Sequence, residues 1–202
     1  MKRLSIFLVG LMAGVTLIGG TSFVLTRFLL PPNFHGMVMQ SQQPARNFML
    51  TSHYGQPVSL SDYRGKVVLL YFGYGACPDV CPATLVELAR ARATLGKDAE
   101  KAQVLMITVD PERDTQEKLA EYITFFDRSF IGLTGTPAQI AEVATYYGIY
   151  YAKHQEETAL GYLVDHTATV MLIDKEGYLR IVYPFGTPAK DFAEDLKYLV
   201  AR

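Results

Sequence analysis

Both cysteines of this chain lie in one short segment whose residue types could bind a soft metal ion or carry out thiol chemistry. Cys77 and Cys81 fall within residues 73–82 and are separated by three residues. Pro82 disfavours helical backbone at Cys81 and is well suited to the first position of a helix, so we expect Cys81 to be the N-cap of a helix that begins at Pro82. The unsatisfied N–H groups of a helix end stabilise a thiolate, which favours metal binding as well as nucleophilic attack.

A histidine is the natural third ligand, because copper(I) prefers thiolates and accepts imidazole. His35 falls in an expected linker, His53 in an early turn and His154 in a polar loop, so we expect these three at the surface. His166 directly precedes an apolar strand, where a polar group is costly without a partner, and it is our candidate ligand; a structural histidine is the alternative. Asp165 beside it is expected to orient a ligand or to tune the charge of the site.

Three other uses of these residues stay open. The cysteines could form a disulfide, although closing so short a loop removes little unfolded-state entropy. They could form a redox-active dithiol, for which the familiar Cys-x-x-Cys spacing is one residue shorter. Zinc also binds two cysteines and one histidine, with a fourth position left for water. The spacing favours metal binding over the redox couple, and it does not distinguish copper from zinc.

The elements that position these residues follow from hydrophobic patterning. An apolar run at residues 66–72 ends where the cysteine segment begins, and its continuous hydrophobicity predicts a strand covered on both faces. Two short strands are expected within residues 48–60. After the cysteines we expect, in order, a helix at 83–95, a strand at 104–109, a helix at 114–126, a strand at 130–133, a helix at 136–148, a hairpin of strands 169–173 and 179–183, and a closing helix from 187.

Two of the expected helices carry capping-box spacing at their N-termini, Asp114 with Glu117 and Thr136 with Gln139. The alternation of strands and helices, closed by a hairpin, predicts an α/β thioredoxin-like fold with added N-terminal strands and a terminal β-hairpin. Sites in such sheets lie at the carboxyl ends of the parallel strands, and the cysteines follow such an end.

The N-terminus predicts a membrane anchor. Residues 4–26 carry no charged side chain, and 23 helical residues would span roughly 35 Å, enough for a hydrocarbon core of about 30 Å. We therefore expect an N-terminal membrane anchor at residues 1–30, a linker at 31–45 and one domain at 46–202. Lys2 and Arg3 place the short N-terminus in the cytoplasm, which makes this a single-pass protein of a bacterial inner membrane with its domain facing the periplasm.

Composition narrows the classes of partner. Hydrophobic residues make up 50% of the chain and aromatic residues 12%, which excludes a disordered protein. The 19 basic and 20 acidic residues give a net charge of -1 without blocks of like charge, so we expect no nucleic-acid partner. Partners other than the membrane must be recognised by shape and specific chemistry.

These residues resemble the SCO/SenC family, whose members assist assembly of the copper site of cytochrome c oxidase. The segment from Cys77 to Pro82 looks like that family's Cys-Pro-x-x-Cys-Pro motif, and residues 110–115, 132–136 and 164–166 look like its other characteristic stretches. The resemblance extends over residues 48–199. It implies that Cys77, Cys81 and His166 bind one copper ion per chain and that Asp165 influences the site.

The resemblance implies a metallochaperone rather than an enzyme. Such a protein would accept copper from a periplasmic donor and pass it by ligand exchange to subunit II of cytochrome c oxidase, or to a similar copper acceptor. The alternative is a thiol-disulfide oxidoreductase that reduces the acceptor's cysteines, with Cys77 or Cys81 as the attacking thiolate. The family commonly has threonine at the position of Gly75, which removes a hydroxyl from the neighbourhood of Cys77 here.

Overall fold

The computed structural model describes residues 33–40, 44–158 and 161–202. The membrane anchor expected at residues 1–30 lies outside these ranges. Within them, no helix combines the length and the apolar character needed to cross a bilayer.

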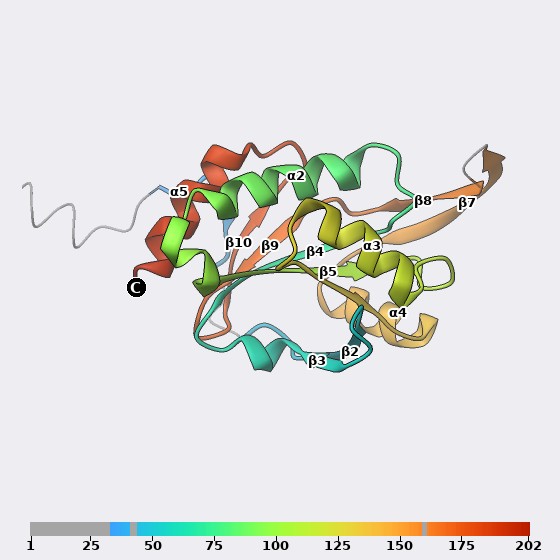
Figure 1. Ribbon diagram of the computed structural model, residues 1–202, viewed down its shortest axis with the longest axis horizontal. Helices are drawn as coiled ribbons and strands as arrows, with labels where there is room; N and C mark the ends of the chain where they lie inside the picture. The colour runs from blue at the N-terminus through green and yellow to red at the C-terminus, as the bar shows by residue number, and fades with distance from the viewer. Residues whose placement is uncertain (1–32, 41–43, 159–160) are drawn as a thin grey trace, which may run out of the picture. The chain divides into compact units, whose positions relative to one another are not determined.

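A mixed eight-stranded sheet forms the centre of the domain, in the order β1-β10-β9-β4-β5-β6-β2-β3 (Figure 1). Its parallel part is β4 (Val67–Gly73), β5 (Ala102–Thr108) and β6 (Ile131–Thr134). On the other side of β4 runs the antiparallel hairpin of β9 (Val170–Ile173) and β10 (Leu179–Tyr183). Parallel strands joined by helical crossovers and closed by a hairpin confirm the predicted thioredoxin-like order.

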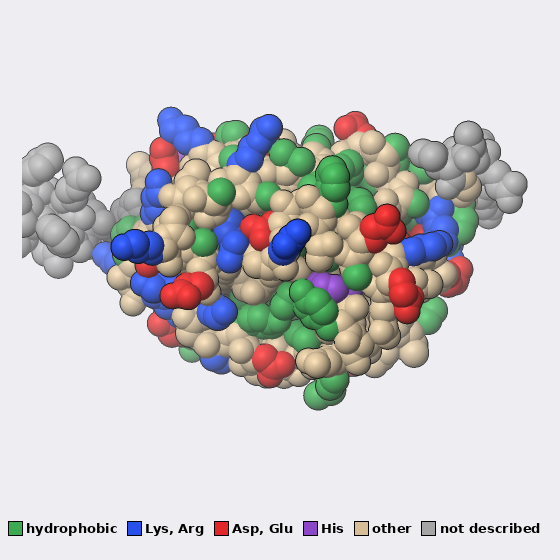
Figure 2. Space-filling model, in the orientation of Figure 1, with side chains coloured by type: hydrophobic (Ala, Val, Ile, Leu, Met, Phe, Trp, Pro, Cys, Tyr) green, Lys and Arg blue, Asp and Glu red, His purple; other side chains and the backbone are tan. Residues whose placement is uncertain are grey.

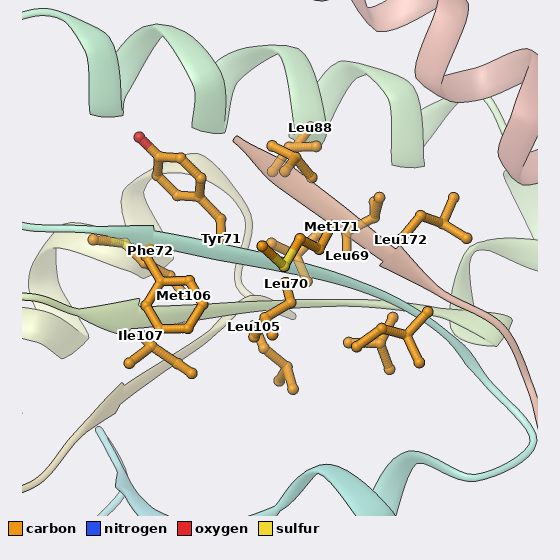
Figure 3. Close-up of a cluster of buried hydrophobic side chains, with 14 of the residues drawn as sticks. Leu69, Leu70, Tyr71, Phe72, Leu88, Leu105, Met106, Ile107, Met171 and Leu172 are labelled. Carbon is orange, nitrogen blue, oxygen red and sulfur yellow. The ribbon is translucent and has the colours of Figure 1, made fainter. Parts of the chain in front are cut away.

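Helices cover both faces of this sheet. Helix α2 (Val80–Ala93) packs against α5 (Ala189–Val200) on one face, and α3 (Gln116–Phe126) packs on β6. Figure 3 shows Tyr71 of β4 pointing toward α2, whereas Phe72 points to the opposite face. There the Phe72 ring meets Tyr147, directly after α4 (Pro137–Tyr146), at 5.9 Å between ring centroids. Because both faces are covered, every residue of β4 and β5 is buried, as the apolar runs predicted.

The shorter elements complete the sheet edges. The predicted N-terminal strands are β2 (Met49–Ser52) and β3 (Pro57–Ser59), which extend the sheet beyond β6. Short 3-10 helices lie at η1 (Leu60–Tyr63) and η2 (Gly96–Lys101). Thr136 and Gln139 form the predicted capping box of α4.

Side chains of both charge signs are interspersed on the surface shown in Figure 2.

Part of the segment expected as a linker belongs to the folded domain. Met37 and Val38 form β1, which pairs with β10 at the edge of the sheet. The preceding His35 donates its backbone N–H to Asp195 at 3.0 Å, and its ring Nε2 lies 3.0 Å from Glu194. His35 is exposed, as expected, but it also contacts helix α5 (Ala189–Val200) of the folded domain. No local pattern predicts this contact, because two residues of strand are too few to produce one and the histidine's partners are distant in sequence.

The polar segment around His154 is a strand rather than the loop expected. It forms β7 (Tyr151–Thr158), which pairs with β8 (Gly161–His166) in a separate two-stranded antiparallel sheet. The sequence of β7 has no alternation of apolar and polar residues, so no periodicity marked it as a strand. This hairpin carries His166 at its base.

The core around β4 allows a prediction on stability. Leu88 of α2 is fully buried against the sheet, and Figure 3 shows it beside the side chains of β4. Replacing Leu88 with alanine should lower the free energy of unfolding by about 2–5 kcal/mol, because the cavity adds to the lost transfer energy. The exposed Lys97→Ala is the control and should stay within about 0.5 kcal/mol of wild type in urea denaturation. Equal effects of the two changes would contradict this packing.

Candidate metal centre

The cysteine loop connects the carboxyl end of β4 to helix α2. Helix α2 begins at Val80 with Asp79 as its N-cap, so the prediction that Cys81 caps the helix was wrong. Cys81 lies in the first turn, where Pro82 is tolerated because its missing N–H needs no partner there. The backbone N–H of Cys81 points to the Cys77 sulfur at 3.4 Å. The Cys77 sulfur is therefore the one that accepts a hydrogen bond from the first turn of helix α2.

His166 brings an imidazole to the two sulfurs from the other side. It ends β8, and its Nε2 lies 3.3 Å from the Cys81 sulfur. The donor atoms of Cys77, Cys81 and His166 all lie within 4.8 Å of one another. The ring is packed edge-on against Tyr74, with 5.8 Å between centroids. The structure thus brings together the three residues that the sequence selected as ligands, in an arrangement that could hold one metal ion.

The two thiols differ in exposure and in charge. Neither forms a disulfide; Cys77 is half-buried and Cys81 is fully buried. A hydrogen bond with the Cys81 thiol holds the pKa of Cys77 well below its usual range, and His166 acts in the same direction against the effect of burial. The interaction with Cys77 and burial together raise the pKa of Cys81. Without a metal, the pair therefore holds an accessible thiolate beside a protected thiol.

Two glycines permit the close packing of the cysteine loop. A Cβ on Gly73 would lie 2.7 Å from the Tyr71 ring and 3.0 Å from the Cys81 sulfur. The N–H of Gly75 donates to the Asp114 carboxylate at 3.0 Å, and a Cβ there would also lie 3.0 Å from an Asp114 oxygen. The SCO/SenC family commonly has threonine where this chain has Gly75. The absence of a side chain at Gly75 leaves its backbone in close contact with the Asp114 carboxylate.

Asp114 supports the cysteine loop instead of capping a helix. It is buried, and it accepts a hydrogen bond from the Thr108 hydroxyl at 2.6 Å as well as from Gly75. Thr115 is the N-cap of α3 and accepts from the N–H of Lys118. The predicted Asp114–Glu117 capping box was wrong by one residue, because tertiary contacts drew the carboxylate inward.

A second group of contacts fastens the β7–β8 hairpin, and with it His166, to the domain. The Tyr162 hydroxyl donates to buried Asp110 at 2.7 Å. Arg113 forms an ion pair with Asp110 and lies over the Tyr162 ring at 3.7 Å from its centroid. The Tyr74 hydroxyl accepts from the N–H of Val164 at 3.2 Å. Residues 110–115 therefore brace both the cysteine loop and the histidine hairpin, a role that their sequence motif alone did not indicate.

The remaining candidates lie away from the three donor atoms. Asp165 is exposed and its carboxylate lies 2.8 Å from His154, since neighbouring residues of β8 point to opposite faces. Its influence on the site stays a prediction. His53 was expected at the surface and is buried: its Nδ1 accepts from the N–H of Gly132 at 3.1 Å. That partner is 79 residues away, so no local pattern signalled the burial.

The state of Cys77 predicts its reactivity with iodoacetamide. Because the pKa of Cys77 is lowered, its thiolate should persist as the pH falls, and the alkylation rate at pH 6 should stay within about twofold of that at pH 8. In the urea-unfolded protein, whose thiols have a pKa near 8.5, the rate should fall about tenfold per pH unit. Mass spectrometry locates the label, and the buried Cys81 in a Cys77→Ser variant is the control, expected to react slowly. An equally steep pH profile in the folded protein would contradict the assignment.

The chain is similar to known proteins of one family. Residues 38–201 match the model of the SCO1/SenC family. The chain is 34% identical to a protein named mitochondrial SCO2 homolog of Mus musculus, over 77% of this chain and 62% of that protein. This chain thus spans less than two thirds of the length of that relative.

Solved structures are similar as well. The copper-bound structure of Bradyrhizobium japonicum ScoI is 38% identical, covers 78% of this chain and 99% of its own, and has a TM-score of 0.71. BsSco, described as a member of the Sco family of cytochrome c oxidase assembly proteins with a disulfide switch, is 21% identical over 81% of this chain and 98% of its own, with a TM-score of 0.63. At that identity the likeness is one of fold.

Proposed function

This chain belongs to the SCO1/SenC family, and we propose that it is a copper metallochaperone that binds one copper ion through Cys77, Cys81 and His166. The observation that carries the proposal is the convergence of two sulfurs and one imidazole nitrogen within 4.8 Å. Thiolates with one imidazole form the donor set that suits copper(I). The copper in a similar structure, that of Bradyrhizobium japonicum ScoI, supports copper over zinc as the ion.

The arrangement suits an ion that must also leave. Copper is cargo here, and Cys77 is half-buried while Cys81 is fully buried, so an incoming thiolate would meet Cys77 before Cys81. Exchange of one ligand at a time lets the ion pass to an acceptor without being released to water. Both cysteines must be reduced to bind it, so disulfide formation would block loading.

The proposed acceptor is subunit II of cytochrome c oxidase, or a similar copper protein, with a periplasmic protein as donor. We place the chain in a bacterial inner membrane, anchored through residues 1–30 with its domain facing the periplasm. The support is the 23-residue uncharged run at residues 4–26, which has the length of a membrane span.

A second candidate function is thiol-disulfide exchange, favoured by the lowered pKa of Cys77. The Cys77 thiolate would attack a disulfide of the acceptor and form a mixed disulfide. Cys81, on losing its proton, would attack Cys77 and release the acceptor. The acceptor then gains two electrons and two protons as a dithiol, and the Cys77–Cys81 disulfide forms.

Anaerobic copper(I) titration of the reduced full-length protein against a competing chelator tests the chaperone function. Wild type should bind one equivalent, and His166→Ala should bind roughly 100-fold more weakly because a ligand is lost. His154→Ala is the matched control, since His154 is exposed and paired with Asp165. It should leave the affinity for copper unchanged.

Weak binding by wild type that does not depend on His166 would reject the three-ligand site. If such a protein still reduced an acceptor disulfide, exchange would become the preferred function. Retained exchange in His166→Ala together with lost copper affinity would separate the two roles.

A further inference from the structure

A tyrosine hydroxyl is buried beside the candidate site without a hydrogen-bond partner. Tyr71 of β4 is fully buried, and its hydroxyl is among the few buried side-chain oxygens in the described part of the chain that lack a partner. Its ring packs edge-on against His166, with 6.2 Å between centroids. A buried polar group that gives up water without gaining a partner destabilises the folded state. Such a group calls for an explanation in terms of function.

The group that this hydroxyl faces is the Cys81 sulfur. Tyr71 and Cys81 flank the same glycine, since a Cβ on Gly73 would touch both. In the described part of the chain, no group accepts from the Tyr71 hydroxyl with the geometry of a hydrogen bond. The Thr84 hydroxyl donates its own hydrogen to the carbonyl of Val80 at 2.9 Å, and it does not accept from Tyr71 with the geometry of a hydrogen bond. Of these two neighbours, only the Cys81 sulfur changes its strength as an acceptor when the site binds a metal ion.

The strength of that acceptor depends on the state of Cys81. A thiol sulfur accepts hydrogen bonds weakly, whereas a thiolate accepts a charge-assisted hydrogen bond. Cys81 must lose its proton to bind a metal ion. Tyrosine keeps its own proton near neutral pH, and burial raises the pKa of Tyr71 further, so the donor is always present.

We propose that Tyr71 is a positioning residue that donates its hydroxyl hydrogen to the Cys81 sulfur when that sulfur holds the metal ion. The inference rests on the proposed copper site and adds to it a fixed donor behind the buried ligand. The hydrogen bond stabilises the negative charge on the sulfur and holds the Cys81 side chain against β4. It also explains why the hydroxyl has no partner while Cys81 is a thiol.

Two other tyrosines near the sulfurs do not take this role. The Tyr122 hydroxyl on α3 also lacks a partner in the described part of the chain, but the Tyr122 ring lies near the Cβ position of Gly75, whereas the atoms nearest that of Gly73 belong to Tyr71 and Cys81. Tyr74 is used elsewhere, because its hydroxyl accepts from the N–H of Val164 in the histidine hairpin.

Replacing Tyr71 with phenylalanine in the full-length protein tests the inference, with Tyr198→Phe as the matched control. Both changes remove a buried hydroxyl without a partner, and Tyr198 lies on α5 with its ring against Phe34. Three quantities are measured: copper(I) affinity by chelator competition, the melting temperature of the reduced metal-free protein, and the sulfur-to-copper charge-transfer absorption of the copper(II)-loaded protein.

Tyr71→Phe should bind copper(I) about tenfold more weakly and shift the charge-transfer band, because one hydrogen bond to the bound sulfur is lost. Its metal-free melting temperature should equal or exceed that of wild type, because the bond is absent in the thiol state. Tyr198→Phe should match wild type in affinity and in the absorption band.

Unchanged affinity and an unchanged band in Tyr71→Phe, with tight binding by wild type, would overturn the inference and leave the proposed function standing. A melting temperature that falls as far without metal as with it would also overturn the inference, because the hydroxyl would then be structural. Failure of wild type itself to bind copper(I) would overturn the proposed function and this inference with it.

Discussion

The packing of the Cys81 sulfur against strand β4 is the contact on which the arrangement of the site depends. The sulfur can lie there because Gly73 has no side chain; a Cβ would approach it to 3.0 Å. In this position the Cys81 sulfur lies 3.3 Å from His166 Nε2, and the backbone N–H of Cys81 points to the Cys77 sulfur. One buried sulfur therefore fixes the distance between helix α2, which carries Cys81, and the hairpin that carries the histidine.

The long-range supports explain how residues 85 positions apart keep this geometry. Asp114 holds the cysteine loop through Gly75, and Asp110 holds the histidine hairpin through Tyr162. Both carboxylates come from the turn that follows β5, at the carboxyl end of the parallel strands. One turn thus holds both the cysteine loop and the histidine hairpin, which are distant in sequence, at the carboxyl ends of the strands, where α/β sheets place their sites.

Local patterns predicted the main strands and helices and selected the three residues whose donor atoms lie together in the structure. A few neighbouring residues are enough to recognise each local pattern: the apolar run of β4, the capping box at Thr136 and the Cys-x3-Cys segment. The features that the sequence could not reveal depend on distant partners. They are the hydrogen bond from Gly132 to buried His53, the hydrogen bond from Gly75 to Asp114, and the pairing of β7 with β8. Cys81 is the second residue of α2 rather than its N-cap, and its backbone N–H points to the Cys77 sulfur, a contact that the sequence did not reveal.

X-ray absorption spectroscopy at the copper edge of the reduced, copper(I)-loaded protein tests the central claim most directly, because it counts the atoms bound to the ion. The account predicts a first shell of two sulfur atoms and one imidazole nitrogen, with the imidazole signal lost in His166→Ala. A shell of sulfur alone, or an imidazole signal that survives the substitution, would contradict the assignment of Cys77, Cys81 and His166 as the ligands.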